Sequence, residues 1–418
     1  MSKDYKKFIE DHGKYFCVLP FTEICNTAQG QGKLCCYSDN VDNVNFNYVS
    51  DFVDTWKNNK QINEIRQRMI DGKPVKQCRR CYQYENAGAY SMSKRINNSI
   101  NIEKQFPGSI QQMKDSKKLT LRSLDIKFGN KCNLACVMCD GGSSSLHVKE
   151  KKNNPVPKEL HNWIAPDGKD NTFDKENLEE LLKQAPNLVK LKFTGGEPTL
   201  LDGFKEFIER LSETEYAKNI EVMIVTNGTT DVTKWIDTFS KFRLFEVNWS
   251  TDGLDSTFEY IRWPGKWDKT TKIQRKFNQT IKEKGYTNIV SILTSAIQLL
   301  NLDQFPKLLE YCEDANFDWF APVLVMWPEP LQLSIAPKHI KEQVIKECLP
   351  YTQKGKRFSE VESFIKIIET SKDSHLTWQD TKKFLNYYDS VRNLYAKDTC
   401  PIYNEIENTI QGVSPLYV

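Results

Sequence analysis

Short apolar segments alternate with amphipathic helical patterns through the middle of the chain. The apolar segments have the length of buried strands, and they are Leu124–Phe128, Val189–Thr194, Ile220–Thr226, Phe245–Ser250, Ile289–Thr294 and Trp319–Val325. The helical patterns between them cover residues 203–212, 231–240, 270–284 and 304–315. Strand and helix units that follow one another in this way predict an α/β fold with a parallel sheet, curled or open.

The segments outside this alternation divide the chain further. The long connection 142–188 is expected to combine an irregular excursion with a helix at 174–184, and the chain turns purely helical from about residue 337, at 337–348, 358–371 and 378–396. We therefore expect four regions: a cysteine-rich module at 1–100, a polar linker at 101–122, the α/β core at 123–330 and a helical region at 331–418.

Three cysteines lie close together just after the first predicted strand of the core. Cys132, Cys136 and Cys139 have C-x3-C-x2-C spacing, with the apolar Met138 before the last of them. An ordinary four-iron cluster takes four thiolates, so three thiolates can hold such a cluster and leave one iron open to a ligand. The alternatives are three free thiols or part of a zinc site. No histidine follows at zinc-finger spacing, which disfavours zinc.

Polar and glycine-rich motifs follow the next strands. Gly195-Gly196-Glu197-Pro198 ends the second strand, where glycines let the backbone approach a ligand closely. Asn227-Gly228 ends the third strand and Ser250-Thr251-Asp252-Gly253 the fourth, while Thr294 ends the fifth. Each could be ordinary turn chemistry. However, ligands of parallel α/β barrels lie at the carboxyl ends of the strands, and every one of these motifs falls at such an end.

The cysteine spacing and the Gly-Gly-Glu segment resemble the radical S-adenosylmethionine (radical SAM) enzymes. The resemblance implies a partial (β/α)6 TIM-like barrel in which Cys132, Cys136 and Cys139 hold a [4Fe–4S] cluster that binds S-adenosylmethionine (SAM). It also implies reductive cleavage of SAM to a 5′-deoxyadenosyl radical, which takes a hydrogen atom from the substrate. The implied SAM-binding residues are Met138, Gly195, Gly196, Glu197, Pro198, Asn227, Ser250, Asp252 and Thr294.

A second set of cysteines lies in the first hundred residues. Cys78 and Cys81 form a C-x2-C pair, and Cys35 ends a Gly-x4-Cys hairpin that follows Cys17. These four thiols resemble the SPASM/twitch auxiliary module, which implies a second, closed [4Fe–4S] cluster. Two departures are clear: the module precedes the barrel here, and its cysteines suit only one cluster. A four-thiolate zinc site remains the alternative, and Cys36 could replace Cys35.

Charge and composition bound the possible partners. The chain has 58 basic and 55 acidic residues, for a formal net charge of +3, and this balance does not favour nucleic acid or a membrane surface. The first residues lack the apolar region of a secretory signal, and no run of the sequence has the length of a membrane helix. Twelve cysteines in such a chain indicate metal ligands in the cytoplasm rather than disulfides.

Three functional hypotheses remain open. The first is a radical SAM enzyme that modifies a peptide or protein, because similar auxiliary modules accompany peptide maturation. The second is a radical SAM enzyme for a nucleotide, modified base or other small metabolite. Either enzyme would need an electron donor of the flavodoxin or ferredoxin type. The third is a non-catalytic metal-binding scaffold, which would have no use for a SAM pocket.

Overall fold

The structure is a computed structural model that describes residues 3–46, 52–86, 93–165, 175–371 and 375–412. It is a mixed α/β protein built on one nine-stranded sheet, in the order β3-β2-β1-β4-β5-β6-β7-β8-β9. The strands are β1 Glu23–Asn26, β2 Gln31–Lys33, β3 Asn40–Asn45, β4 Ser123–Ile126, β5 Lys190–Phe193, β6 Glu221–Thr226, β7 Leu244–Ser250, β8 Ile289–Ile297 and β9 Trp319–Leu324.

The six predicted core strands are confirmed as β4 to β9, and each pairs in parallel with the next. The helices of this part of the chain are α8 Ser145–Asn153, α9 Lys175–Lys183, α10 Asp202–Ser212, α11 Ile236–Phe239, α12 Asp255–Ile261, α13 Trp267–Lys284 and α14 Phe305–Asp314. The helix predicted at 231–240 begins as a 3-10 turn, Val232–Trp235, and only its second half is α-helical. Part of the predicted irregular excursion, residues 166–174, lies outside the described residues.

The first hundred residues, which show little periodicity in sequence, contain both helices and strands. Their helices are α1 Lys3–His12, α2 Leu19–Thr22, α3 Phe52–Asn58, α4 Lys60–Ile70, α5 Arg79–Asn86 and α6 Lys94–Gln105. Strand β1 pairs in parallel with β4 and antiparallel with β2, so this region extends the core sheet. The segment 101–122, predicted as a polar linker, holds the end of α6 and α7 Ser109–Ser116. Its polar composition therefore belongs largely to helix surfaces.

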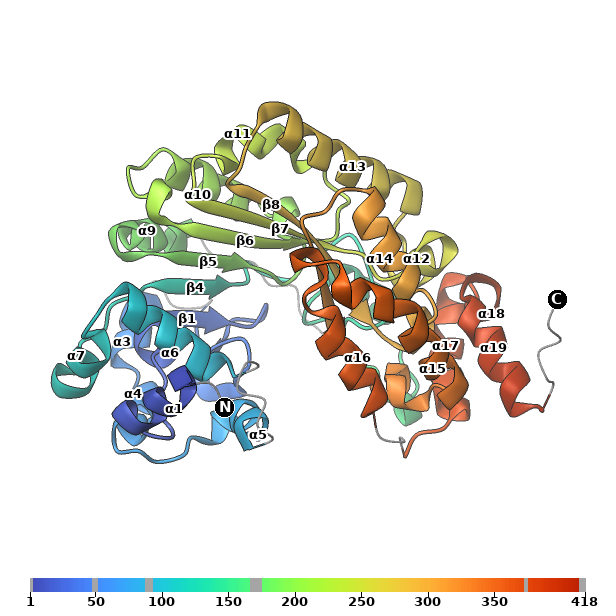
Figure 1. Ribbon diagram of the computed structural model, residues 1–418, viewed down its shortest axis with the longest axis horizontal. Helices are drawn as coiled ribbons and strands as arrows, with labels where there is room; N and C mark the ends of the chain where they lie inside the picture. Colours follow the sequence, from blue (N-terminus) through green and yellow to red (C-terminus); the bar gives the residue numbers. More distant parts are fainter. Residues whose placement is uncertain (1–2, 47–51, 87–92, 166–174, 372–374, 413–418) are drawn as a thin grey trace.

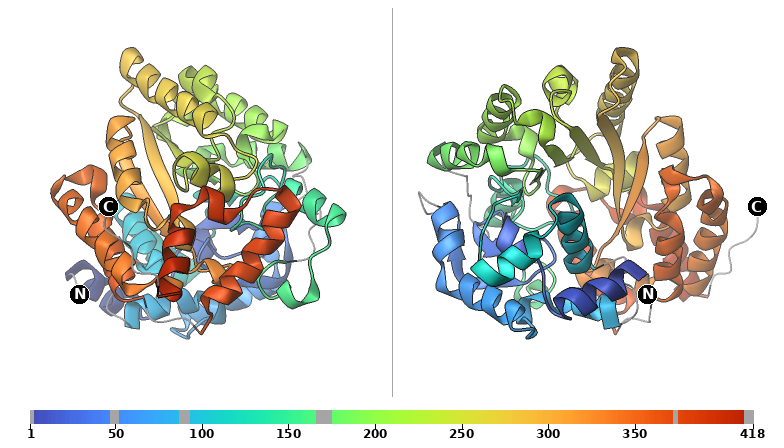
Figure 2. Two further views of the ribbon diagram at one scale, coloured as in Figure 1. Left: turned by 90° about the vertical axis from the view of Figure 1, so that its right-hand side faces the viewer. Right: turned by 60° about the vertical axis from the view of Figure 1, so that its left-hand side comes forward.

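The C-terminal region is helical, as predicted from sequence. Its helices are α15 Lys338–Cys348, α16 Val361–Glu369, α17 Trp378–Arg392, α18 Ala396–Thr399 and α19 Pro401–Ile410. They lie on the side of α12 and α14, whereas the N-terminal helices lie by β1 and β4 (Figures 1 and 2). The two regions thus flank opposite parts of the sheet. In the part of the chain that the structure describes, no helix has the length and apolarity needed to cross a membrane.

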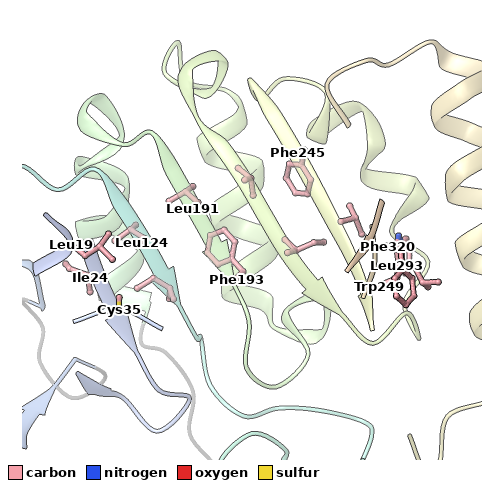
Figure 3. Packing of buried hydrophobic residues seen from close by; sticks show 14 of the residues in the cluster. Leu19, Ile24, Cys35, Leu124, Leu191, Phe193, Phe245, Trp249, Leu293 and Phe320 are labelled. Atoms are coloured by element: carbon pink, nitrogen blue, oxygen red, sulfur yellow. The ribbon is translucent and has the colours of Figure 1, made fainter. Parts of the chain in front are cut away.

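The two faces of the sheet differ in chemistry because side chains alternate along each strand. Leu191, Phe193 and Phe245 point to the outer face, where α9, α10, α11 and α13 cover the sheet (Figures 1 and 3). The intervening residues point inward and include an ion pair between Asp125 and Lys192, whose charged atoms lie 3.2 Å apart. A parallel sheet is ordinarily apolar on both faces. The polar inner face therefore marks the side that is available for chemistry.

Candidate active site

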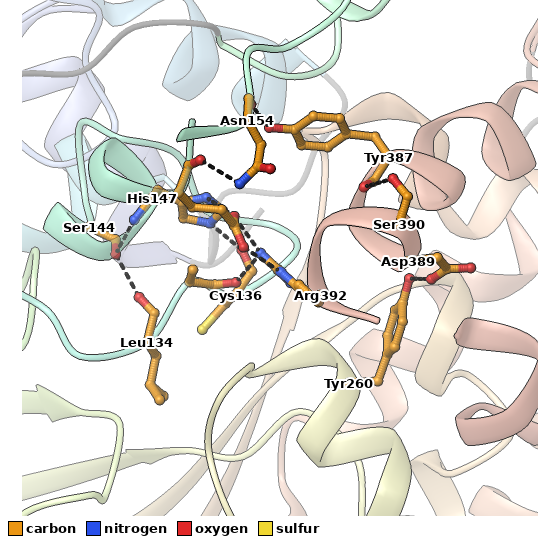
Figure 4. A network of polar contacts seen from close by, with 12 residues as sticks. Leu134, Cys136, Ser144, His147, Asn154, Tyr260, Tyr387, Asp389, Ser390 and Arg392 are labelled. Atoms are coloured by element: carbon orange, nitrogen blue, oxygen red, sulfur yellow. Dashed lines mark hydrogen bonds and ion pairs between the residues drawn. The ribbon is translucent and has the colours of Figure 1, made fainter. Parts of the chain in front are cut away.

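The three clustered cysteines lie in the loop between β4 and α8, and backbone contacts hold this loop in place. The backbone N–H of Ala135 donates to the carbonyl of Trp263 at 2.7 Å, and that of Val137 donates to Ile261 at 2.9 Å. The Ser144 hydroxyl donates to the carbonyl of Leu134 at 2.6 Å (Figure 4). The loop is therefore anchored to the chain at the end of α12 and to the start of α8.

The surroundings of the three thiols differ. The sulfur of Cys132 accepts hydrogen bonds from the Leu134 backbone N–H at 3.5 Å and from the Asn227 amide at 3.8 Å. Burial and the nearby Cys136 raise the pKa of Cys132 to about 12. By contrast, a hydrogen bond with Cys139 and the charge of Arg262 lower the pKa of Cys136 to about 7, against the effect of burial. The hydrogen bond with Cys139 and the nearby cation thus favour the thiolate form of Cys136.

The loop opens into a cavity of about 350 Å³ that brings the predicted motifs together. All three cysteines line it, together with eight of the nine predicted SAM-binding residues: Met138, Gly195, Gly196, Glu197, Asn227, Ser250, Asp252 and Thr294. Pro198 is the exception, because it is buried at the start of a 3-10 turn, Pro198–Leu200, and does not line the cavity. Residues from β5, β6, β7 and β8 thus meet the cysteine loop at one end of the sheet.

The Gly-Gly segment lies directly against the cysteine loop. Gly195 and Gly196 have φ values of +74° and +51°, a region that L side chains rarely adopt. The Gly196 N–H donates to the carbonyl of Ser143 at 3.1 Å, and the Glu197 N–H donates to that of Lys131 at 2.8 Å. A Cβ on Gly196 would lie only 2.7 Å from the Lys131 carbonyl oxygen. Only glycine allows this close approach of the two backbones.

Glu197 connects the ends of two strands through its carboxylate. It accepts hydrogen bonds from the Thr199 hydroxyl at 2.6 Å, the Thr226 hydroxyl at 2.8 Å and the Asn227 N–H at 2.6 Å. Burial raises the pKa of this carboxyl, against the effect of these hydrogen bonds. The resemblance stated above implied that Glu197 binds SAM. In the structure this carboxylate already holds the ends of β5 and β6 in register while facing the cavity.

Asp252 is held by a partner that the sequence did not suggest. Its carboxylate forms an ion pair with Arg262 and accepts a hydrogen bond from the Ala296 N–H at 2.6 Å. Arg262 is only 8% exposed and lines the cavity, and its Nε atom is buried without a hydrogen-bond partner. Arg262 therefore places a cation with a spare donor beside Cys136. Its sequence context, IRWPG, carries no pattern that would have singled it out.

The remaining predicted polar residues differ in how they are fixed. The Asn227 amide donates to Asn133 at 3.0 Å and accepts from the Thr229 hydroxyl at 2.7 Å, so its orientation next to Cys132 is set. The Thr294 hydroxyl donates to Asn248 at 3.2 Å, and the Asn248 amide nitrogen has no partner. Ser250 lies beside Thr294 in the β7–β8 pairing. Asn227, Ser250 and Thr294 thus give the cavity a partly polar lining.

Helix α17 reaches the cysteine loop from the C-terminal region (Figure 4). Arg392 donates from Nε and Nη2 to the two carboxylate oxygens of Glu150 at 2.8 and 2.9 Å, and from Nη2 to the carbonyl of Ala135 at 2.7 Å. His147 Nε2 donates to the carbonyl of Cys136 at 2.8 Å. Burial works against the charge of Glu150, but the nearby His147 ring and the hydrogen bonds from Arg392 prevail and lower its pKa to about 2.

The N-terminal cysteines that were predicted to act together affect one another electrostatically. Cys17, Cys35, Cys78 and Cys81 are all buried. Burial raises the pKa of Cys17 and of Cys78, and neighbouring thiols of the same set, Cys81 among them, raise both further. Burial raises the pKa of Cys36, and among the nearby charges Lys192 lowers it while Asp125 raises it. Cys35 and Cys36 both line a cavity with these two residues.

The predicted C-x2-C loop is largely helical, because Cys78 ends a 3-10 turn and Cys81 lies in the first turn of α5. Across the described ranges, no three His, Cys, Asp or Glu side chains gather closely enough to hold a single metal ion.

Comparison with known proteins agrees with this geometry. Residues 126–312 match the Radical SAM superfamily. This segment is therefore a radical SAM domain, a kind of domain found in enzymes. The match does not identify which reaction is catalysed. The chain is 26% identical over 196 residues to the sporulation killing factor maturation protein SkfB of Bacillus subtilis. The aligned region covers 46% of this chain and 40% of that protein. It is 31% identical over 160 residues to the GTP 3′,8-cyclase of Helicobacter pylori, covering 35% of this chain and 46% of that enzyme.

Solved structures give weaker similarities. Native anSMEcpe with bound AdoMet aligns with a TM-score of 0.40 and 19% identity, covering 58% of this chain and 62% of that one. Streptococcus suis SuiB bound to precursor peptide SuiA aligns with a TM-score of 0.39 and 14% identity, covering 65% of this chain and 58% of that one. The chain thus spans less than half the length of the two curated relatives and somewhat less than two thirds of these structures.

Proposed function

Because residues 126–312 form a radical SAM domain, we propose that this protein cleaves SAM reductively and uses the 5′-deoxyadenosyl radical to take a hydrogen atom from a peptide or protein. The observation that carries this proposal is the single cavity in which three thiols of one loop meet the Gly-Gly segment and the polar strand ends. The donor set fits the group that the fold implies, since three thiolates leave one iron of a four-iron cluster open.

The residues of the cavity have distinct roles in this proposal. Cys132, Cys136 and Cys139 would hold the [4Fe–4S] cluster, which supplies the electron for SAM cleavage. Gly195 and Gly196 give the methionyl end of SAM access to the backbone beside the cysteine loop. Arg262, a buried cation whose Nε lacks a partner, is suited to bind the SAM carboxylate.

Further side chains would hold the rest of SAM. Asn227, Ser250 and Thr294 would supply polar contacts to its ribose and carboxylate, and Met138 an apolar contact beside the cluster. Asp252 acts through Arg262, whose charge it balances. Enclosure by these residues also excludes water from a reactive intermediate.

We assign a second [4Fe–4S] cluster to Cys17, Cys35, Cys78 and Cys81. All four thiols are buried and the pKa shifts of Cys17 and Cys78 arise partly from the others of the set, which supports a shared site. We assign Cys35 rather than Cys36 to it, because burial, Glu23 and Cys17 raise the pKa of Cys35, whereas the charges that act most strongly on Cys36 are those of Lys192 and Asp125. Such a cluster could accept the electron left on an oxidised substrate. We expect a protein with twelve cysteines as free thiols or metal ligands to work in the reducing cytoplasm.

Two substrate classes follow from the comparisons. A peptide or protein is favoured because SkfB is a maturation protein and because the N-terminal thiol set resembles an auxiliary module. A nucleotide is the second candidate, since the H. pylori relative is a GTP 3′,8-cyclase. Incubation in ordinary H2O buffer with a deuterated candidate peptide or with deuterated GTP tests the two substrate classes. Deuterium should move into 5′-deoxyadenosine only from a member of the true substrate class.

The core activity is tested by anaerobic reconstitution with iron and sulfide, followed by SAM and either dithionite or a flavodoxin- or ferredoxin-type donor. The expected product is 5′-deoxyadenosine, detected by mass spectrometry. Cys136→Ala should abolish it, because two thiolates cannot hold the cluster, while the iron bound at the N-terminal site should remain. Persistent SAM cleavage in the Cys136→Ala protein would show that the cysteine loop is not the reactive site.

A further inference from the structure

Two buried ion pairs with the same geometry lie beside the two cysteine sites. At the active site, Arg392 approaches Glu150 side-on through Nε and Nη2, at 2.8 and 2.9 Å. In the N-terminal region, Arg95 approaches Glu85 through the same two atoms, at 3.1 and 2.6 Å. In both pairs the arginine side chain is 1% exposed, and the glutamates are 4% and 6% exposed.

Each arginine also donates to the backbone immediately before a cysteine. Arg392 Nη2 donates to the carbonyl of Ala135 at 2.7 Å, and the next residue is Cys136. Arg95 Nη1 donates to the carbonyl of Phe16 at 2.6 Å, and the next residue is Cys17. The two arrangements come from unrelated parts of the chain, yet each places one guanidinium next to one thiol of a candidate metal site.

The sequence separations show that these contacts are long-range. Arg392 ends α17 and reaches a carbonyl 257 residues earlier, whereas Arg95 on α6 reaches one 79 residues earlier. Each glutamate lies on a different helix from its arginine, namely α8 for Glu150 and α5 for Glu85. Each pair therefore joins two helices to the backbone beside a cysteine.

We infer that Arg392 and Arg95 are positioning residues that fix one cysteine backbone each, and that each Arg–Glu pair sets the reduction potential of the cluster held beside it. This inference rests on the proposed function, which supplies the two clusters. A positive charge near a cluster stabilises the reduced, more negative form, and a negative charge destabilises it. In the intact pair the two charges nearly cancel, so removal of either one leaves the other unbalanced in a low-dielectric interior.

Two variants that each remove the charge of one member of a pair should therefore shift the reduction potential of the neighbouring cluster in opposite directions. Arg392→Gln leaves Glu150 uncompensated and should make the active-site cluster harder to reduce. Glu150→Gln leaves Arg392 uncompensated and should make it easier to reduce. We expect each shift to change the ratio of reduced to oxidised cluster at a fixed potential by about tenfold, equivalent to about 59 mV for a one-electron couple. A purely structural role would move both variants in the same direction or neither.

The experiment is a redox titration of the reconstituted full-length protein, followed by electron paramagnetic resonance. The active-site signal is identified as the one that changes when SAM is added. Arg392→Gln and Glu150→Gln should shift only this signal, whereas Arg95→Gln and Glu85→Gln should shift only the N-terminal signal. The two pairs are thus matched controls for each other. Iron content and circular dichroism show that each variant is folded and loaded.

The outcomes separate this inference from the proposed function. If the wild-type protein shows no signal that responds to SAM, the proposed function fails. If that signal is present but both variants of the Arg392 pair shift it in one direction, or leave it unchanged, the inference is overturned. Should Arg392→Gln fail to fold, the isosteric Glu150→Gln still decides the sign. An N-terminal site without any redox signal would refute the auxiliary cluster and, with it, the role assigned to Arg95.

Discussion

Replacement of Gly196 by alanine tests the close contact between the Gly-Gly segment and the cysteine loop. The residue has a φ of +51°, and a left-handed conformation costs an L side chain roughly 1–2 kcal/mol. In addition, the new Cβ would lie 2.7 Å from the Lys131 carbonyl oxygen, next to Cys132. Relief of such an overlap by backbone movement costs about 1–3 kcal/mol, so the total is about 2–5 kcal/mol.

Gly285→Ala is the matched control for this substitution. Gly285 has a φ of +68° at the end of α13, and a Cβ there would meet nothing within 4 Å. This variant should therefore show only the conformational cost of roughly 1–2 kcal/mol. The difference between the two variants isolates the contact with the cysteine loop.

The assay combines chemical denaturation with SAM binding and 5′-deoxyadenosine formation. If the overlap is relieved by movement of the cysteine loop, about 1–3 kcal/mol should appear as a roughly 5- to 150-fold weaker affinity for SAM. Gly285→Ala should bind SAM as the wild-type protein does. Equal stability and equal SAM affinity in the two variants would refute the account of why glycine is needed at position 196.

Two further predictions concern the N-terminal site and the pH dependence of stability. Cys78→Ala combined with Cys81→Ala should remove roughly half the iron if each site holds one four-iron cluster, and should retain SAM cleavage; an unchanged iron content would count against the second cluster. Burial, with the charge of Glu405, raises the pKa of Asp303 from 3.8 to about 6. The folded state therefore binds the extra proton between these values, and stability should fall as the pH rises from about 4 to 6. Asp303→Asn should remove up to about 3 kcal/mol of this decline, measured by denaturation at pH 4 and pH 8, and an identical decline in the variant would contradict the assignment.

The repeating part of the fold was predictable because local patterns determine it. Each core strand is a short apolar run that pairs with the next such run, so all six were located from sequence within a few residues. The site motifs were predictable for the same reason, since glycines and polar residues at strand ends have a meaning that depends on short spacing alone. The cysteine loop and the Gly-Gly segment thus meet in one cavity, as expected.

The contacts that were not predicted depend on residues far apart in the chain. The pairing of β1 with β4 joins segments about 100 residues apart, and no local pattern marks β1 as part of the core sheet. Arg262 and Arg392 reach the cysteine loop only through the packing of α12 and α17. A buried arginine has the same sequence appearance as an exposed one, because its burial depends on a carboxylate partner elsewhere, Asp252 or Glu150.

The central claim is that Cys132, Cys136 and Cys139 leave one iron free to bind SAM. The most direct measurement is electron-nuclear double resonance of the reduced cluster with SAM carrying 15N in its amino group and 17O in its carboxylate. The account predicts hyperfine coupling from both labels to the cluster, lost in Cys136→Ala. A reduced cluster that shows no coupling to either label, with all four irons bound by side chains of the protein, would contradict it.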